Sequence, residues 1–127
     1  MTIQQINPIF RSFDETKAKE FYVDYLGFKV TFEHRFDPDA PLYLGLQLPP
    51  DDGKEALFEL HLSEHHGDAC PGSTIRIQID NIDALHETLA SKKYKYARPS
   101  IEQQPWGFRE VKVTDPFGNK IIFCQPS

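Results

Sequence analysis

An internal repeat constrains the fold of this chain more than any other sequence feature. In the first half, an extended segment from Ile3 to Phe10 precedes Asp14, a predicted helix N-cap. In the second half, Thr74 to Ile79 precedes Asp80, which is 66 residues beyond Asp14 and is also a predicted cap. The apolar face of the first helix is Ala18, Phe21, Tyr22 and Tyr25, and that of the second is Ile82, Leu85 and Leu89.

Three more extended segments follow each predicted helix. Gly27 is placed to end the first helix, because glycine accepts a left-handed backbone. Alternation then puts Phe28, Val30, Phe32, His34 and Phe36 on one strand face. The remaining predicted strands are Leu42 to Leu48, Ala56 to Leu62, Tyr94 to Ala97, Phe108 to Val113 and Lys120 to Cys124, with a turn at Pro49 to Gly53.

Each half is therefore predicted to form a β-α-β-β-β unit. The halves are 1–63 and 73–127, with 64–72 as a linker, inside a single domain of 127 residues. One such unit leaves a sheet face uncovered, so two units are expected to form an α+β fold with a curved mixed sheet and a groove.

Composition removes several classes of function. The chain has 14 basic and 19 acidic residues and a net charge of -5, which argues against a nucleic-acid partner. No apolar run of membrane-spanning length and no secretory leader is present, so no membrane partner and a cytoplasmic location are expected. Cys70 and Cys124 do not have metal-type spacing, and a reduced state is the default.

The only tryptophan lies in the motif Gln104-Pro105-Trp106-Gly107. Proline and glycine on either side predict a loop or a strand edge for Trp106. An aromatic ring held there can serve as a flat wall for a ligand, although packing against a dimer partner is an alternative.

These features together resemble the vicinal oxygen chelate superfamily, which includes glyoxalases, extradiol dioxygenases and bleomycin resistance proteins. The chain is most similar to the bleomycin resistance branch. The motifs that carry the resemblance are 21–28 (FYVDYLGF), 61–68 (HLSEHHGD), 104–107 (QPWG) and 115–119 (DPFGN).

In catalytic members of this superfamily, four strand positions hold a divalent metal. By the surrounding motifs these positions fall at Asn7, Glu59, Thr74 and Ile122. Only Glu59 is a strong ligand, and a shift of two residues would bring in His61 instead. A catalytic zinc site needs about three protein ligands, so neither a metal nor a cofactor is expected. A zinc site at His61 and His65 is an alternative, but separate linker and surface histidines are favoured.

The resemblance implies a homodimer, with the repeats domain-swapped or paired in it, whose grooves sequester a planar, cationic antibiotic such as bleomycin without changing it. The expected ligand-binding residues are Phe32, Phe36, Glu59, His61, Trp106 and Arg109. Phe32 has an equally good interpretation as a core residue. Arg109 is also a candidate partner for Glu59. The alternative functions are a metal-dependent enzyme of the glyoxalase or dioxygenase type and a binder of another metabolite.

Overall fold

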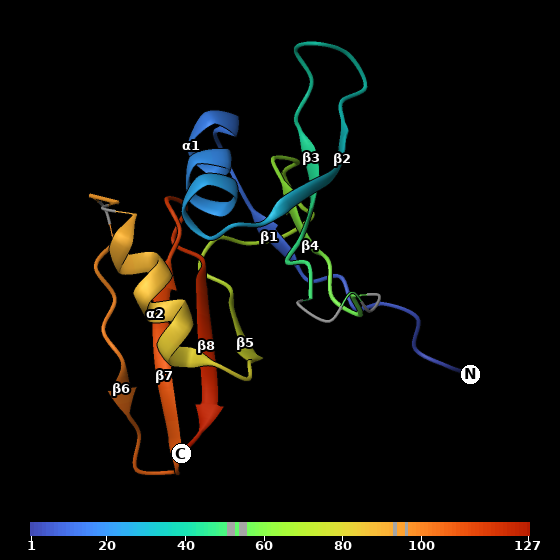
Figure 1. Cartoon of the computed structure of the whole chain (residues 1–127). Coiled ribbons are helices and arrows are strands. Elements are labelled where there is room, and N and C mark those ends of the chain that lie inside the picture. Colours follow the sequence, from blue (N-terminus) through green and yellow to red (C-terminus); the bar gives the residue numbers. More distant parts are fainter. Residues whose placement is uncertain (51–52, 54–55, 93, 96) are drawn as a thin grey trace. The chain divides into compact units, whose positions relative to one another are not determined.

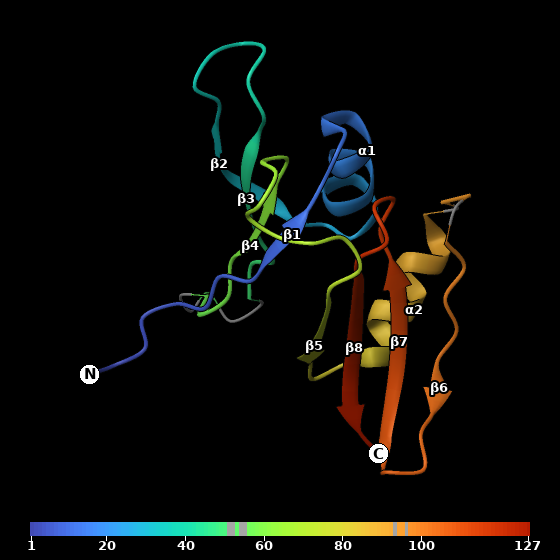
Figure 2. The same ribbon diagram turned by 180° about the vertical axis from the view of Figure 1, so that it is seen from behind.

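The computed structural model describes residues 1–50, 53, 56–92, 94–95 and 97–127. The chain divides into two compact units, Met1–Pro71 and Gly72–Ser127. Each unit contains one four-stranded sheet and its own helical segment (Figures 1 and 2). None of the described helices is long and apolar enough to cross a membrane.

The first unit follows the predicted β-α-β-β-β order. Its sheet has the strand order β1-β4-β3-β2, with β1 parallel to β4 and the other neighbours antiparallel. The elements are β1 (Ile9–Arg11), α1 (Glu15–Lys19), the π-helical segment η1 (Glu20–Tyr25), β2 (Lys29–His34), β3 (Tyr43–Gln47) and β4 (Leu60–Ser63).

The second unit has the same topology. Its strand order is β5-β8-β7-β6, again with only the first and last strands of the unit parallel. The elements are β5 (Thr74–Gln78), α2 (Ile82–Ser91), β6 (Glu102–Gln103), β7 (Phe108–Thr114) and β8 (Lys120–Pro126). The predicted repeat and the α+β class are therefore confirmed.

The first helical segment forms as its sequence predicts. The Asp14 carboxylate accepts a hydrogen bond from the Lys17 N–H at 2.9 Å, and Gly27 ends the segment with φ of 84°. The predicted apolar face is fully buried, since Ala18, Phe21, Tyr22 and Tyr25 are each at most 2% exposed. Side chains spaced by one helical turn thus supply much of the core of this unit.

The second helix begins one residue later than predicted. Its N-cap is Asn81, whose side-chain oxygen accepts from the Ala84 N–H at 3.1 Å, so the assignment to Asp80 is wrong. The Asp80 backbone carbonyl instead accepts from the Gln125 side chain at 2.6 Å. Ile82 and Leu89 are buried and Leu85 is half-buried.

Strand boundaries depart from prediction where pairing partners are distant in sequence. The strand predicted from Ile3 to Phe10 is shorter in the structure, where it comprises Ile9–Arg11. Before it, Ile6 makes an isolated bridge with Phe58, and the residues that precede Ile6 are exposed. Similarly, the strand predicted from Ala56 starts only at Leu60.

The strand predicted from Tyr94 to Ala97 is not found there. The Ala97 N–H donates to the Tyr94 carbonyl in a turn, and the next strand lies at Glu102–Gln103; Tyr96 is outside the described residues. In the turn predicted from Pro49 to Gly53, the Gly53 N–H donates to the Pro50 carbonyl; residues 51 and 52 are not among those the structure describes.

The strand after the first helix does not present one continuous face. Phe28 is 1% exposed, whereas Phe32 is 39% and Phe36 81% exposed. Pairing with β3 shifts register between Val30 and Phe32, which changes the side to which the following residues point. Phe32 is therefore a partly exposed residue and not a core residue.

Candidate functional site

One face of the first sheet carries an aromatic cluster whose Phe32 ring is partly exposed. Alternation buries Phe10, Leu44 and Leu62 on one side of the sheet, as neighbours in one row. The two rows that flank this one point to the opposite side of the sheet. One flanking row consists of Ile9, His61, Gly45 and Phe32, and the other of Arg11, Ser63, Tyr43 and His34. We call this second side the open face.

Three rings meet on the open face. The Phe32 and Tyr43 rings stack at 6.0 Å with an interplanar angle of 14°. The His61 ring meets Phe32 edge-on at 5.3 Å and Tyr43 at 5.2 Å. Such offset and edge-to-face pairs are favourable, so the cluster is held in a defined geometry with part of the Phe32 ring still exposed.

Gly45 makes this arrangement sterically available. A Cβ atom on Gly45 would collide with the Phe32 ring and with the Thr31 hydroxyl. Because glycine has no side chain, the ring can lie directly over the backbone of β3. The close approach of an aromatic ring is the physical reason for a glycine in the middle of this strand.

A chain of hydrogen bonds runs beside the rings. Tyr43 Oη lies 2.7 Å from His61 Nδ1, and His61 Nε2 lies 3.0 Å from Glu59 Oε1. Gln47 donates to the second oxygen of Glu59 at 3.2 Å. The side chains of His61 and Glu59 are only 14% and 12% exposed, so the polar groups are largely shielded and mutually paired.

The electrostatic environment of Tyr43 is negative. Burial raises the pKa of Tyr43, and the negative charges of Asp68 and Glu59 raise this pKa further. Asp68 is fixed nearby, because it accepts a 2.6 Å hydrogen bond from Ser63, the residue opposite Tyr43 in the sheet. The phenol of Tyr43 is thus kept neutral, with two carboxylates close to it.

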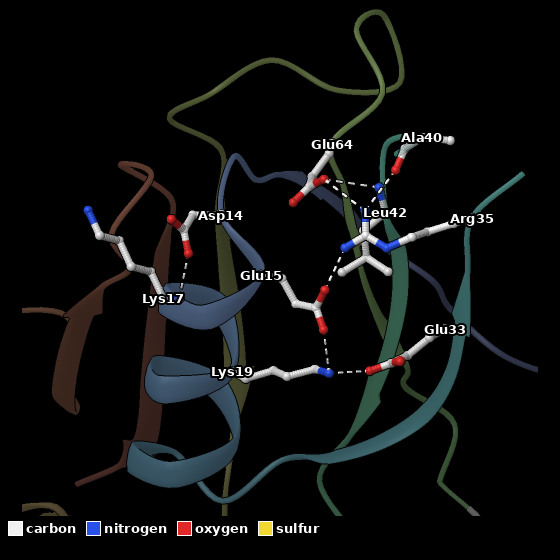
Figure 3. A network of polar contacts seen from close by, with 9 residues as sticks. All are labelled: Asp14, Glu15, Lys17, Lys19, Glu33, Arg35, Ala40, Leu42 and Glu64. Carbon is white, nitrogen blue, oxygen red and sulfur yellow. Dashed lines mark hydrogen bonds and ion pairs between the residues drawn. The ribbon is translucent and has the colours of Figure 1, made fainter. Parts of the chain in front are cut away.

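Phe36 lies beyond the end of β2, in the loop to β3. Its ring contacts His34 at 5.0 Å and His65 at 6.3 Å, both edge-on. Figure 3 shows how the base of this loop is held: Arg35 donates to the Ala40 carbonyl at 2.7 Å and also pairs with Glu15.

The same polar network ties the helix to the sheet. Lys19 pairs with Glu15 at 2.8 Å and with Glu33 of β2, so cations and carboxylates alternate between α1 and the hairpin (Figure 3). The pKa of Glu15 is lowered by its hydrogen bonds to Lys19 and to Arg35. The network therefore fixes the root of the loop that carries Phe36.

Trp106 belongs to the second unit, in the turn that joins β6 and β7. The Gly107 N–H donates to the Gln104 carbonyl at 3.1 Å, and Gly107 has φ of 87°. Trp106 is 60% exposed. Its predicted location in a loop is confirmed, and its indole is largely accessible.

Arg109 is engaged within the second unit. Its guanidinium makes two hydrogen bonds to Asp83 of α2, at 2.9 and 2.7 Å. Glu59 itself is paired with Gln47 and His61 within the first unit.

Glu110 is a second carboxylate of interest, because it is only 1% exposed. It pairs with Arg76, whose guanidinium also lies 5.4 Å from the centre of the Phe108 ring. The buried charge is thereby compensated within its own unit.

The donors at the four superfamily metal positions do not fit a divalent metal ion. The Asn7 amide donates to the Glu59 carbonyl at 3.1 Å and to Gln5 at 2.9 Å, Thr74 offers one neutral oxygen, and Ile122 offers none. In the part of the chain that the structure describes, no group of three His, Cys, Asp or Glu side chains converges, including around His61 and His65.

Strand register identifies the second position as His61 and not Glu59. Ile9, two residues after Asn7, pairs with His61, and Arg76, two residues after Thr74, pairs with Ile122. The repeat therefore makes His61 the counterpart of Ile122. This correction supplies one imidazole but leaves the set short of the ligands that a metal site needs.

Sequence reasoning brought Phe32, Glu59 and His61 to one place but missed Tyr43, Gly45 and Gln47. The signal for these three was present in their spacing, since alternate residues of one strand share a face. A glycine that shares its strand face with two polar residues, as Gly45 does with Tyr43 and Gln47, marks a sheet face that a ring can approach.

Comparison with known proteins places the chain in a class. A family model described as glyoxalase superfamily protein matches residues 1–127, and the chain belongs to this superfamily. No curated protein matches it significantly.

Solved structures give more particular likenesses. The bleomycin-binding protein of the bleomycin producer Streptomyces verticillus, solved with copper(II)-bleomycin, is 29% identical; the alignment covers 100% of this chain and 99% of that one, with a TM-score of 0.68. TnmS3, an antibiotic-binding protein from Streptomyces sp. CB03234, is 25% identical over 100% and 97%, with a TM-score of 0.68. A glyoxalase-related enzyme from Clostridium phytofermentans shares the fold at 22% identity, 100% and 98% coverage and a TM-score of 0.75.

Proposed function

We propose that this protein binds a planar, cationic antibiotic of the bleomycin type and sequesters it without chemical change. The observation that carries the proposal is the open face of the first sheet, where the Phe32 ring is presented beside Tyr43 and His61. A planar ligand stacked on this surface gains both apolar burial and ring-to-ring contact.

The similarity to two antibiotic-binding proteins supports this proposal. Support also comes from the donor set, because Asn7, Thr74 and Ile122 do not supply the ligands that the metal chemistry of the superfamily requires. Binding by rings, shape and charge needs no such ligands.

We further propose that the protein acts as a homodimer in the cytoplasm. Trp106 and Phe36 are exposed as large apolar side chains in one copy, which favours their use in contacts with a ligand or a second copy. Sedimentation equilibrium of the purified chain tests the dimer, and a monomer at micromolar concentration would contradict it.

Calorimetric titration with metal-free bleomycin tests ligand binding. We expect saturable heat at micromolar drug and recovery of the drug with unchanged mass. Phe32→Ala should weaken binding about tenfold, since it removes a stacking surface. Phe13→Ala is the matched control, because Phe13 is an exposed phenylalanine of the same unit outside the three-ring cluster. Absence of heat with the folded protein would refute bleomycin as the ligand.

A metal-dependent enzyme is the second candidate, because Glu59 and His61 are two metal-capable side chains 3.0 Å apart. Elemental analysis of protein purified without chelator distinguishes the two functions. One tightly bound metal ion per chain, lost in His61→Ala, would support the enzyme and contradict the metal-free binder.

A further inference from the structure

We propose that a cavity at the C-terminal end of α2 is a second small-molecule site, which binds an apolar molecule carrying one carboxylate, with Arg98 as its counter-ion. The cavity has a volume of about 370 Å³ and lies between the last turn of α2 and the connection that leads to β6 (Figure 1). The residues that line it belong to the second unit. The site therefore differs in place and in ligand charge from the open face of the first sheet.

The walls of this cavity are mostly apolar. The described residues that line it are Leu89, Ala90, Tyr94, Ala97, Arg98 and Pro99. Leu89 is 2% exposed and belongs to the buried face of α2, while Tyr94 and Ala97 are half-buried. A cavity of this size is at the lower end of the range for ligand pockets, so it suits a body of one or two rings.

Local bonds hold the backbone around the cavity. The Ala97 N–H donates to the Tyr94 carbonyl at 3.4 Å, and the Lys92 N–H donates to the Leu89 carbonyl at 3.3 Å. Pro99 has a fixed φ and disfavours a helical backbone at the residue before it. These constraints limit the positions that Arg98 can take at the cavity.

Arg98 is the only charged residue among the described residues that line the cavity. It is exposed, and no other described residue forms a hydrogen bond or ion pair with it. The other arginines of the second unit, Arg76 and Arg109, are both paired with carboxylates. A guanidinium only donates, and it binds a carboxylate through two parallel hydrogen bonds. One unpaired arginine beside apolar walls therefore matches a monoanionic carboxylate.

The charges around Arg98 favour the same class of ligand. Segment 92–98 (KKYKYAR) holds four of the 14 basic residues, and no acidic residue occurs between Glu87 and Glu102. The carbonyl end of α2 disfavours an anion, but it is equivalent to only about half a charge. The chain as a whole has a net charge of -5, which argues against a nucleic acid as the occupant.

Nuclear magnetic resonance of the nitrogen-15-labelled protein, titrated with 2-naphthoate, tests this site. We expect saturable shifts at the amides of Leu89, Ala90 and Arg98, and about tenfold weaker binding of the uncharged 2-naphthylmethanol. Arg98→Gln should weaken naphthoate about tenfold and leave the alcohol unchanged. Lys120→Gln is the matched control, because it removes one charge from an exposed residue of the same unit outside the cavity. It should change neither affinity.

A second variant tests the cavity itself. Ala90→Leu fills the space while keeping Arg98, and leucine is a good helix former, so both probes should bind more weakly with no fall in the urea midpoint. Equal binding of the two probes, or equal weakening of naphthoate by Arg98→Gln and Lys120→Gln, overturns the assignment of Arg98.

The remaining outcomes separate this site from the proposed function. Shifts confined to the first unit, or none at millimolar naphthoate, overturn the second site and leave bleomycin binding untouched. A short single-stranded oligonucleotide that displaces naphthoate would assign the basic segment to nucleic acid and would overturn the proposal as well.

Discussion

The contact between Gly45 and Phe32 allows a quantitative test of how the open face is built. In Gly45→Ala, the new Cβ collides with the Phe32 ring and the Thr31 hydroxyl, so both side chains must rotate. Leaving a favourable rotamer costs roughly 0.5–1.5 kcal/mol, and loss of the stacked and edge-on contacts costs a further ~0.5–1.5 kcal/mol. Replacing a strand glycine with alanine returns about 0.5–1 kcal/mol.

The expected net effect is a loss of about 1 kcal/mol in the free energy of unfolding, measured by urea denaturation. The decisive measurement is a double-mutant cycle. In the Phe32→Ala background the ring is absent and only the Thr31 hydroxyl has to rotate, so Gly45→Ala should cost much less there. We therefore expect a coupling energy of about 1 kcal/mol between the two sites.

Ligand binding should follow the same coupling. Gly45→Ala displaces the ring without removing it, so it should weaken binding of metal-free bleomycin nearly as much as Phe32→Ala does, and the double variant should be no weaker than Phe32→Ala. Additive effects on stability, together with unchanged binding in Gly45→Ala, would refute the view that this glycine exists to seat the ring.

Three further predictions concern stability. Asn81→Ala should cost about 1 kcal/mol in chemical denaturation because it removes the helix cap, whereas Asp80→Ala should cost clearly less; the reverse order would contradict the observed cap. Asp115→Ala should cost about 3 kcal/mol in the same assay, since this buried carboxylate accepts from the Phe117 and Asn119 backbone and from the Asn119 amide; a cost below about 1 kcal/mol would count against it. The hydrogen bonds that lower the pKa of Glu15 stabilise the fold at pH values above the ordinary carboxyl pKa of 4.5, and this stabilisation is lost as the pH falls through the lower pKa of the folded state. Glu15→Gln should therefore make the free energy of unfolding less dependent on pH in the acid range. An unchanged pH dependence would show that the network contributes nothing.

Local sequence signals predicted the parts of the fold that depend on near neighbours. The cap at Asp14, the buried helical face and the stop at Gly27 all involve residues within one or two turns of each other. Even the repeat was visible, because it consists of two such local patterns in the same order. The class of the fold followed from these signals.

Features that depend on distant pairing were not predictable in this way. The first strand forms a continuous ladder only over Ile9–Arg11, and its partner β4 lies about fifty residues away along the chain. The exposure of Phe32 follows from a register shift against β3, which alternation in one strand cannot reveal. Alternation places Tyr43 on one strand face with Gly45 and Gln47, but its place beside His61 is set by the pairing of β3 with β4, which that alternation does not reveal.

The two halves show how the fold and the site are separable. Strand pairing makes Leu44 the counterpart of Val111, both buried and apolar, while it makes His61 the counterpart of Ile122 and Gly45 that of Lys112. The buried positions thus keep their character, and the positions on the opposite side of each sheet differ.

A substitution on the open side changes few buried contacts, so ligand choice can alter there with little effect on stability. The recognition chemistry should therefore reside in the positions where the halves differ. Exchanging His61 for the residue of its counterpart, as in His61→Ile, should abolish the preference for a cationic ligand. Because it also removes the hydrogen bonds of His61 to Tyr43 and Glu59, the urea midpoint should fall, but by less than when the buried Leu44 is replaced by alanine.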